Sequence, residues 1–162
     1  MRRTDREITD PAQMEDILRR GQVVHLALTD GNLPYVVPLN YGFALERDKR
    51  VLYFHGAGAG KKLELIRKNP QAAFCVDLGH GLVRGDSAAQ YSYRYESVLG
   101  SGIITEVRDL EEKRRGLMVI FAQYEKTLPF QAEEKLVEHT AVLRLEIQTL
   151  TGKRRTQKER NP

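Results

Sequence analysis

Apolar and polar residues alternate along much of the chain with the two-residue period of β-strands. One side of the strand predicted over residues 22–30 carries Val24, Leu26 and Leu28. The turn at residues 30–32, Asp-Gly-Asn, joins this strand to residues 33–45, and the combination is typical of a β-hairpin. The same pattern predicts further strands at 51–55, 72–78, 90–109 and 140–152.

Helices are predicted between these strands. Asp10 can cap a helix that begins at Pro11 and ends at Gly21. Asp109 and Glu112 have the spacing of a capping box for another helix. The apolar face of that helix consists of Leu117, Ile120, Phe121 and Tyr124. Two further helical segments are predicted, at residues 61–70 and at about residues 130–139.

The consecutive hairpins favour a mainly β fold, in which an antiparallel barrel has helices packed outside it. A parallel sheet is the alternative, but tight turns argue against it because parallel strands need long crossover connections. Pro34 and Pro38 lack N–H donors, so residues 33–45 should form an edge strand or be interrupted. Glycines 100 and 102 indicate a bend or bulge, and the polar, glycine-rich residues 79–88 are predicted to form a loop.

Length and charge suggest a single domain over residues 1–152, followed by a basic, disordered tail at 153–162. The net charge is +4. The tail contains five bases and one acid and alone supplies this charge, so the remaining part is close to neutral. Nucleic acid is not expected as a partner, because no aromatic residue lies among these bases.

The single cysteine, Cys75, allows no disulfide within the chain and fits a reducing cytoplasm, where we expect the protein to lie. We expect neither a signal peptide nor a membrane span, because no apolar run is long enough for either. His25, His80 and His139 have no metal-ligand spacing with one another or with Cys75, so no metal site is expected.

The most distinctive segment is YFHGAGAGKK, from Tyr53 to Lys62, where a glycine-rich bend leads to two lysines that begin a helix. It is not a P-loop, because His55 replaces the first glycine and Lys62 replaces the hydroxyl residue. It is not a dinucleotide-binding fingerprint, because Lys61 stands where a glycine is required.

Two interpretations of Lys61 and Lys62 remain. Both side chains point to solvent and the bend is a plain connector, or an anion, most simply a phosphate, offsets their charge. A helix N-terminus presents free N–H groups and a partial positive charge, so cations are disfavoured there unless an anion is bound.

Three segments, in this order, resemble the FMN-binding split-barrel proteins: PYVVPLNYGF, LYFHGAGAGKKLELIRKNP and YSYRYESVLGSG. More closely, they resemble the nitroimidazole-resistance (Nim-type) branch, which is related to pyridoxamine 5′-phosphate oxidase. The resemblance covers residues 2–107 and extends more weakly to residue 152. It implies a six-stranded antiparallel split β-barrel with flanking helices, and a homodimer that binds FMN in two grooves at its interface.

The resemblance also implies roles for particular residues. Residues 38–41 would lie beside the isoalloxazine ring, and residues 55–57 near the ring and the ribityl chain. Lys61 and Lys62 would hold the phosphate, and three residues of the long strand would approach the flavin of the partner subunit. The implied cofactor-binding residues are Pro38, Leu39, Asn40, Tyr41, His55, Gly56, Ala57, Lys61, Lys62, Ser92, Tyr95 and Ser97.

His55 is the candidate catalytic residue, as a flavin neighbour or a substrate proton donor, because imidazole titrates near neutral pH. The alternative is a histidine whose hydrogen bonds are satisfied at a strand end. The chain has Ala89 and Tyr91 where many members of the resembled family carry cysteine and tryptophan. This departure leaves the substrate and any covalent chemistry open.

The resemblance therefore implies a flavoprotein oxidoreductase that passes electrons from NADH or NADPH to a small acceptor such as a nitroaromatic compound. No nicotinamide-binding motif is present, so the donor would bind transiently over the flavin. A non-catalytic flavin-binding module for storage or sensing is the alternative, and a protein with an empty groove that acts through its basic tail is a third.

Overall fold

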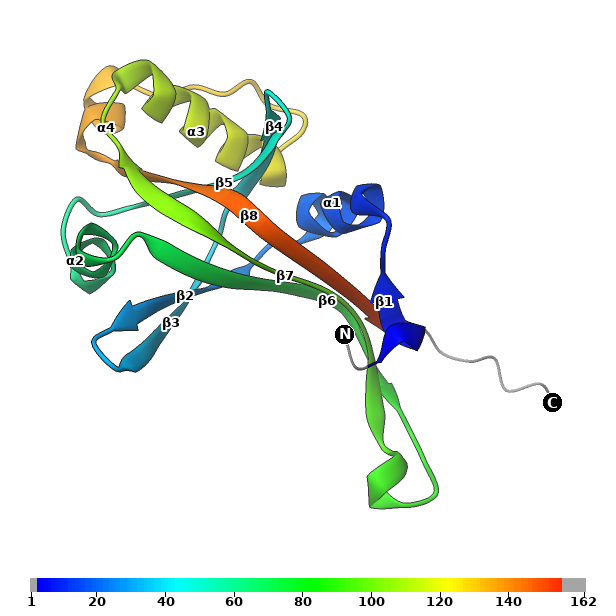
Figure 1. Ribbon diagram of the computed structural model, residues 1–162. Helices are drawn as coiled ribbons and strands as arrows, with labels where there is room; N and C mark the ends of the chain where they lie inside the picture. Colours follow the sequence, from blue (N-terminus) through cyan, green and yellow to red (C-terminus); the bar gives the residue numbers. More distant parts are fainter. Residues whose placement is uncertain (1–2, 156–162) are drawn as a thin grey trace.

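The computed structural model describes residues 3–155, and its main feature is an antiparallel sheet with helices around it (Figure 1). The strands are β1 (Glu7–Ile8), β2 (Val24–Asp30), β3 (Leu33–Leu39), β4 (Gly42–Glu46), β5 (Lys49–Gly56), β6 (Gln71–Val83), β7 (Ser92–Val107) and β8 (Ala141–Arg155). The helices are α1 (Pro11–Arg20), α2 (Lys61–Lys68), α3 (Leu110–Tyr124) and α4 (Glu134–His139), with short 3-10 helices η1 (Thr4–Arg6) and η2 (Ala88–Gln90).

The strands form one sheet in the order β3-β2-β6-β7-β8-β5-β4, and β1 pairs with β8. All of these pairings are antiparallel, which confirms the predicted mainly β fold with flanking helices. β3 and β4 lie at opposite edges of the sheet, yet only Asn40 and Tyr41 separate them in the chain. The sheet must therefore curl until its edges approach each other, although they are not hydrogen-bonded, and this arrangement is a split barrel.

Helix starts lie where the capping residues predict them. The Asp10 carboxylate accepts a hydrogen bond from the Ala12 N–H at 2.9 Å, and the Asp109 carboxylate accepts one from the Glu112 N–H at 2.8 Å. The predicted apolar face of α1 is buried in the main core, and it consists of Met14, Ile17 and Leu18. α4 begins at Glu134, a few residues later than predicted.

The number of strands differs from the prediction. Within residues 3–155 there are eight strands rather than six, because residues 33–45 divide into the two edge strands and β1 adds a short pairing. The division follows the predicted interruption of that segment. The predicted irregularity near Gly102 is also confirmed, since the register of β7 and β8 shifts between Ser101 and Gly102.

The prediction of a loop over residues 79–88 is wrong for the first half of that segment. β6 continues to Val83, past a bulge between Leu78 and Gly81, and its end pairs with the start of β7. This hairpin extends away from the body of the protein (Figure 1), so it needs no apolar face and its sequence looks like a loop. β8 likewise continues through residues 153–155, which were assigned to the tail, while residues 156–162 lie outside the described residues.

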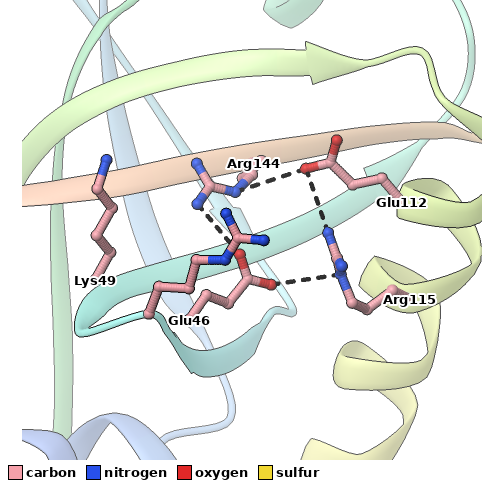
Figure 2. Close-up of a pocket in the computed structure, with 6 residues that line it drawn as sticks. Glu46, Lys49, Glu112, Arg115 and Arg144 are labelled. Atoms are coloured by element: carbon pink, nitrogen blue, oxygen red, sulfur yellow. Dashed lines mark hydrogen bonds and ion pairs between the residues drawn. The ribbon is translucent and has the colours of Figure 1, made fainter.

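A cluster of charged side chains fastens α3 to the sheet (Figure 2). Glu46 of β4 pairs with Arg144 of β8 at 3.2 Å and with Arg115 of α3 at 3.6 Å. Glu112 pairs with Arg144 at 3.7 Å, and the Tyr53 hydroxyl donates a hydrogen bond to Glu46 at 2.8 Å. The two carboxylates, Glu46 and Glu112, and the two guanidinium groups, Arg115 and Arg144, balance one another in charge, so these contacts serve packing.

Gly42 sets how closely β4 and α3 approach. A Cβ atom here would lie 2.6 Å from the backbone of Val119 and Ile120, which cannot yield unless the helix moves. We expect Gly42→Ala to lower the free energy of unfolding, measured by urea denaturation, by about 1–3 kcal/mol. Gly58→Ala is the control, because no atom lies within 4 Å of its Cβ position. Equal stability of the two variants would contradict this packing.

Candidate functional site

The glycine-rich bend joins the end of β5 to the start of α2. Gly60, the residue before α2, has a φ angle of 124°, which favours glycine strongly, and it provides no side-chain hydrogen bond to the helix. The first N–H groups of a helix have no partner within the helix. The start of α2 therefore presents donors that no capping side chain satisfies, which is the geometry of an anion site.

Lys62 lies beside this bend. Its side chain is half-buried, and a Cβ atom added at Gly56 would lie 3.3 Å from its Nζ atom. Lys62 forms no ion pair with any residue in the described part of the chain. Burial lowers the pKa of its ammonium group below the ordinary value. An ammonium that is partly desolvated and has no carboxylate partner is suited to bind an anion.

Lys61 is placed differently from Lys62. Its Nζ atom forms an ion pair with Asp30 at 2.6 Å and lies 5.5 Å from the centre of the Tyr35 ring. The Lys61–Asp30 pair is exposed, and the hydrogen bond from Lys61 lowers the pKa of the Asp30 carboxyl. The sequence treated the two lysines as equivalent, whereas in the structure only Lys62 lacks a carboxylate partner.

His55 lies at the end of β5, next to Gly56. Its Nδ1 atom is the one buried side-chain nitrogen or oxygen in residues 3–155 that has no hydrogen-bond partner. Burial, and then the nearby Lys62 ammonium, lower the pKa of His55 below the ordinary value. The imidazole is therefore neutral at pH 7 and has an unused polar atom. Within the described residues the hydrogen-bonding capacity of His55 Nδ1 is thus not satisfied, contrary to the alternative interpretation.

His55 and Asn40 line one pocket, with a volume of about 560 Å³. Most of its other lining is apolar and comes from α3 and from the segment that leads through α4: Leu117, Ile120, Phe121, Tyr124, Phe130 and Leu136. We call this cavity the α3–α4 pocket. The sequence analysis assigned the α3 residues only to a packing face and missed the pocket. The sequence feature that could have indicated the pocket is the width of the apolar stripe on α3. Only part of this stripe is buried in the core, since Ile120 is buried and Tyr124 is exposed.

The other predicted site residues divide between the core and the surface. Tyr41 is fully buried, donating its hydroxyl hydrogen to the Leu18 carbonyl at 2.6 Å, so its side chain is not available to a ligand. Its N–H donates to the Tyr124 hydroxyl at 2.9 Å. Leu39 packs against the core, whereas Pro38 and Ala57 are exposed.

The candidates on β7 lie on two faces of the sheet. Strand register places Tyr95 and Ser97 on the outer face, the same face as Pro38. Strand alternation directs Ser92 to the opposite face, and its hydroxyl contacts the guanidinium of Arg155, the β8 residue that pairs with Tyr95. The structure therefore brings His55, Gly56, Asn40 and Lys62 together, and leaves the β7 residues apart from them.

Two kinds of feature are absent from residues 3–155. No group of three or more His, Cys, Asp or Glu side chains is arranged to hold a metal ion. None of the helices in this range combines the length and the apolar character needed to cross a membrane.

Comparisons with known proteins agree with this fold. Residues 10–154 match the model of the family described as pyridoxamine 5′-phosphate oxidase. A candidate 5-nitroimidazole antibiotic resistance protein from Bacteroides thetaiotaomicron is 32% identical, with a TM-score of 0.78 over 91% of this chain and 85% of that chain. None of the curated proteins matches the chain.

Two more distant structures share the architecture. The flavocytochrome Anf3 from Azotobacter vinelandii is 26% identical, with a TM-score of 0.77 over 97% of this chain and 72% of that one. The FAD and heme binding protein from Mycobacterium smegmatis is 21% identical, with a TM-score of 0.78 over 92% and 73%. The match over nearly the whole chain and the open barrel agree with the resemblance found in the sequence, and the chain belongs to the pyridoxamine 5′-phosphate oxidase family.

Proposed function

We propose that this chain binds FMN, with Lys62 and the N-terminus of α2 holding the phosphate and with His55, Gly56 and Asn40 next to the flavin ring. The observation that carries the proposal is the half-buried Lys62 ammonium, which lies beside the glycine-rich bend without a carboxylate partner. A phosphate monoester would supply the missing charge and accept hydrogen bonds from the free N–H groups of α2.

The residues of the site fit a flavin. The glycine-rich bend leaves open space at Gly58 and Gly60, where no atom lies within 4 Å of a Cβ position. His55 supplies an unused hydrogen-bonding atom close to Lys62. The names of related structures point in the same direction, because they include a flavocytochrome and an FAD-binding protein.

We propose further that the protein is an oxidoreductase that uses NADH or NADPH to reduce a small acceptor such as a nitroaromatic compound. Bound FMN would supply the hydride and electron transfer, which no side chain can perform. The chain would bind and orient the flavin and keep a neutral imidazole beside it. The acceptor is suggested by the name of the 32% identical protein, a candidate 5-nitroimidazole resistance protein.

The visible spectrum tests this function. Protein reconstituted with FMN should absorb near the flavin maxima, bleach when NADH or NADPH is added, and recover its colour when a nitroaromatic compound follows. A yellow protein that no donor bleaches would favour the storage or sensing alternative. A protein that binds no FMN would contradict the proposal altogether.

We propose that a second copy of the chain covers the outer face of β2, β6 and β7. Most paired residues on this face are small, apolar or weakly polar: Val36, Pro38, His25, Ala27, Ala73, Cys75 and Leu99. The face also carries the Asp77 carboxylate, which lies 3.8 Å from His25 Nδ1. Exposed apolar surface of this kind is typical of interfaces. Tyr95 lies on the same face and is partly exposed, so a dimer could bring it to the flavin of the partner subunit, whereas Ser97 on this face is only 8% exposed.

Leu99→Glu tests the dimer. Leu99 is 47% exposed in the middle of this face, and a buried carboxylate would oppose association. We expect the variant to shift the monomer–dimer equilibrium at least about tenfold toward monomer in sedimentation equilibrium. Leu45→Glu is the matched control, because Leu45 is 49% exposed on β4, at the sheet edge. A monomeric wild-type protein, or equal association of both variants, would rule out this interface.

A further inference from the structure

The α3–α4 pocket has no role in holding a phosphate, yet it opens next to His55. We propose that it is the binding site of the electron acceptor, and that it selects small, planar, uncharged aromatic molecules. This inference rests on the proposed function, because it names the substrate class of the same site. Its volume of about 560 Å³ is sufficient for a single aromatic ring with substituents, since ligand pockets commonly measure about 300–1,000 Å³.

The lining argues for an uncharged ligand. Glu125 is the one carboxylate among the residues that line the pocket. Its carboxylate already accepts hydrogen bonds from the Thr127 N–H and hydroxyl, at 2.7 Å and 2.5 Å. No lysine or arginine lines the pocket, so the phosphates of a nicotinamide dinucleotide would find no partner there. The pocket therefore offers no cationic partner for the phosphates of the electron donor.

The shape of the lining favours an aromatic ring. Phe121 and Phe130 meet edge to face, with ring centres 5.7 Å apart and planes at 60°. Such a pair presents both a ring face and a ring edge to a ligand, and both are favourable contacts for another aromatic ring. Leu117 and Leu136 supply further apolar surface.

His55 supplies the polar contact. Its buried Nδ1 atom has no partner within the described residues, and His55 is one of the two members of the lining that were predicted to be next to the flavin. A neutral imidazole with its hydrogen on Nδ1 would donate to an acceptor atom of the ligand, such as a nitro oxygen. The pocket would thus hold the ring in apolar surroundings and fix one polar substituent at His55.

Leu136→Trp tests the site by filling it. Leu136 lies at the rim on α4 and is 62% exposed, so a larger side chain can be accommodated without unfolding. We expect nitrobenzene binding to the FMN-loaded protein, measured by ligand-observed NMR titration, to weaken at least about tenfold. Leu128→Trp is the control, because Leu128 lies in the connection between α3 and α4, is 65% exposed and does not line the pocket. It should bind nitrobenzene within about twofold of wild type.

The flavin affinity of the same variants separates the outcomes. Unchanged FMN affinity with weakened nitrobenzene binding in Leu136→Trp alone supports the inference. Equal nitrobenzene binding by the two tryptophan variants overturns it while leaving the FMN proposal intact. Equal loss of FMN and nitrobenzene in Leu136→Trp also overturns it, because the pocket would then hold the flavin ring. If no FMN binds at all, nitrobenzene titration of the flavin-free variants still decides whether the pocket binds aromatic rings.

A second variant tests the contact with His55. In His55→Leu, the preference for nitrobenzene over toluene, two ligands of similar shape, should fall by about fivefold to tenfold, because a hydrogen bond to the nitro group is lost. An unchanged preference would show that Nδ1 does not contact the ligand. Toluene binding should stay close to that of wild type, which shows that the pocket itself is intact.

Discussion

Replacing Lys62 with alanine is expected to weaken FMN binding by about 10- to 100-fold, because a charge-assisted hydrogen bond to phosphate contributes about 1.5–3 kcal/mol. Riboflavin lacks the phosphate, so its affinity should change by less than about twofold. Flavin fluorescence quenching gives both dissociation constants on the same protein samples. The comparison isolates the phosphate contact from contacts to the ring and the ribityl chain.

Lys61→Ala is the matched control for this experiment. The Lys61 ammonium is paired with Asp30 at 2.6 Å, and both groups are exposed, so its loss should weaken FMN binding by less than about fivefold. Equal losses of FMN affinity in the two variants would show that the ion pair with Asp30 does not make Lys61 less important than Lys62 for phosphate binding. Equal losses of FMN and riboflavin in Lys62→Ala would show that Lys62 does not hold the phosphate.

Replacing His55 with glutamine is expected to lower the turnover number for nitroaromatic reduction by about 100-fold or more, the usual effect of losing a group that handles protons. FMN affinity should remain within about threefold of wild type, because His55 is not part of the proposed phosphate site. Stopped-flow reduction and reoxidation of the FMN-loaded protein measure the two half-reactions separately. An unchanged turnover number would remove His55 from the reaction.

The pH profile gives His55 a signature that a purely structural role would not produce. Burial and the Lys62 ammonium both disfavour the imidazolium, so the His55 pKa lies below the ordinary 6.5. If the neutral ring is the active form, the rate stays constant as the pH falls through 6.5. The rate then declines as the pH passes the lowered pKa. His55→Gln should lack that decline.

Local sequence signals predicted much of the fold. Asp10 and Asp109 cap their helices through neighbours two and three residues away, so the sequence pattern alone contains both partners. The antiparallel hairpin of β2 and β3 likewise depends on a short turn and alternating side chains. These features are decided within a few residues, and for that reason they could be predicted.

Features that depend on distant contacts were not predictable. An interruption in residues 33–45 was predicted, but the placement of its two halves at opposite edges of the sheet follows from the curling of the whole sheet, which no local pattern describes. The difference between the adjacent lysines comes from Asp30, which lies far from Lys61 in the sequence. The burial of Tyr41 depends on the carbonyl of Leu18 in α1. In each case the outcome depends on a contact with a residue that is distant in the sequence, and the sequence pattern does not reveal that contact.

The candidate site shows the same limit. His55, Gly56 and Lys62 belong to one continuous segment, which the sequence analysis singled out, and the structure places these three residues close together. The α3–α4 pocket combines His55 with α3 and α4, which begin more than fifty residues later in the chain. These elements come together because α3 packs on β4 and β5. Gly42 allows the close approach of the α3 backbone, and the ion pairs shown in Figure 2 stabilise it.

A crystal structure of the protein saturated with FMN tests the central claim most directly. We predict that the phosphate lies within hydrogen-bond distance of Lys62 Nζ and of backbone N–H groups at the start of α2, with the Lys61–Asp30 pair still formed. Electron density that places the phosphate elsewhere, while Lys62 remains without an anionic partner, would contradict the account.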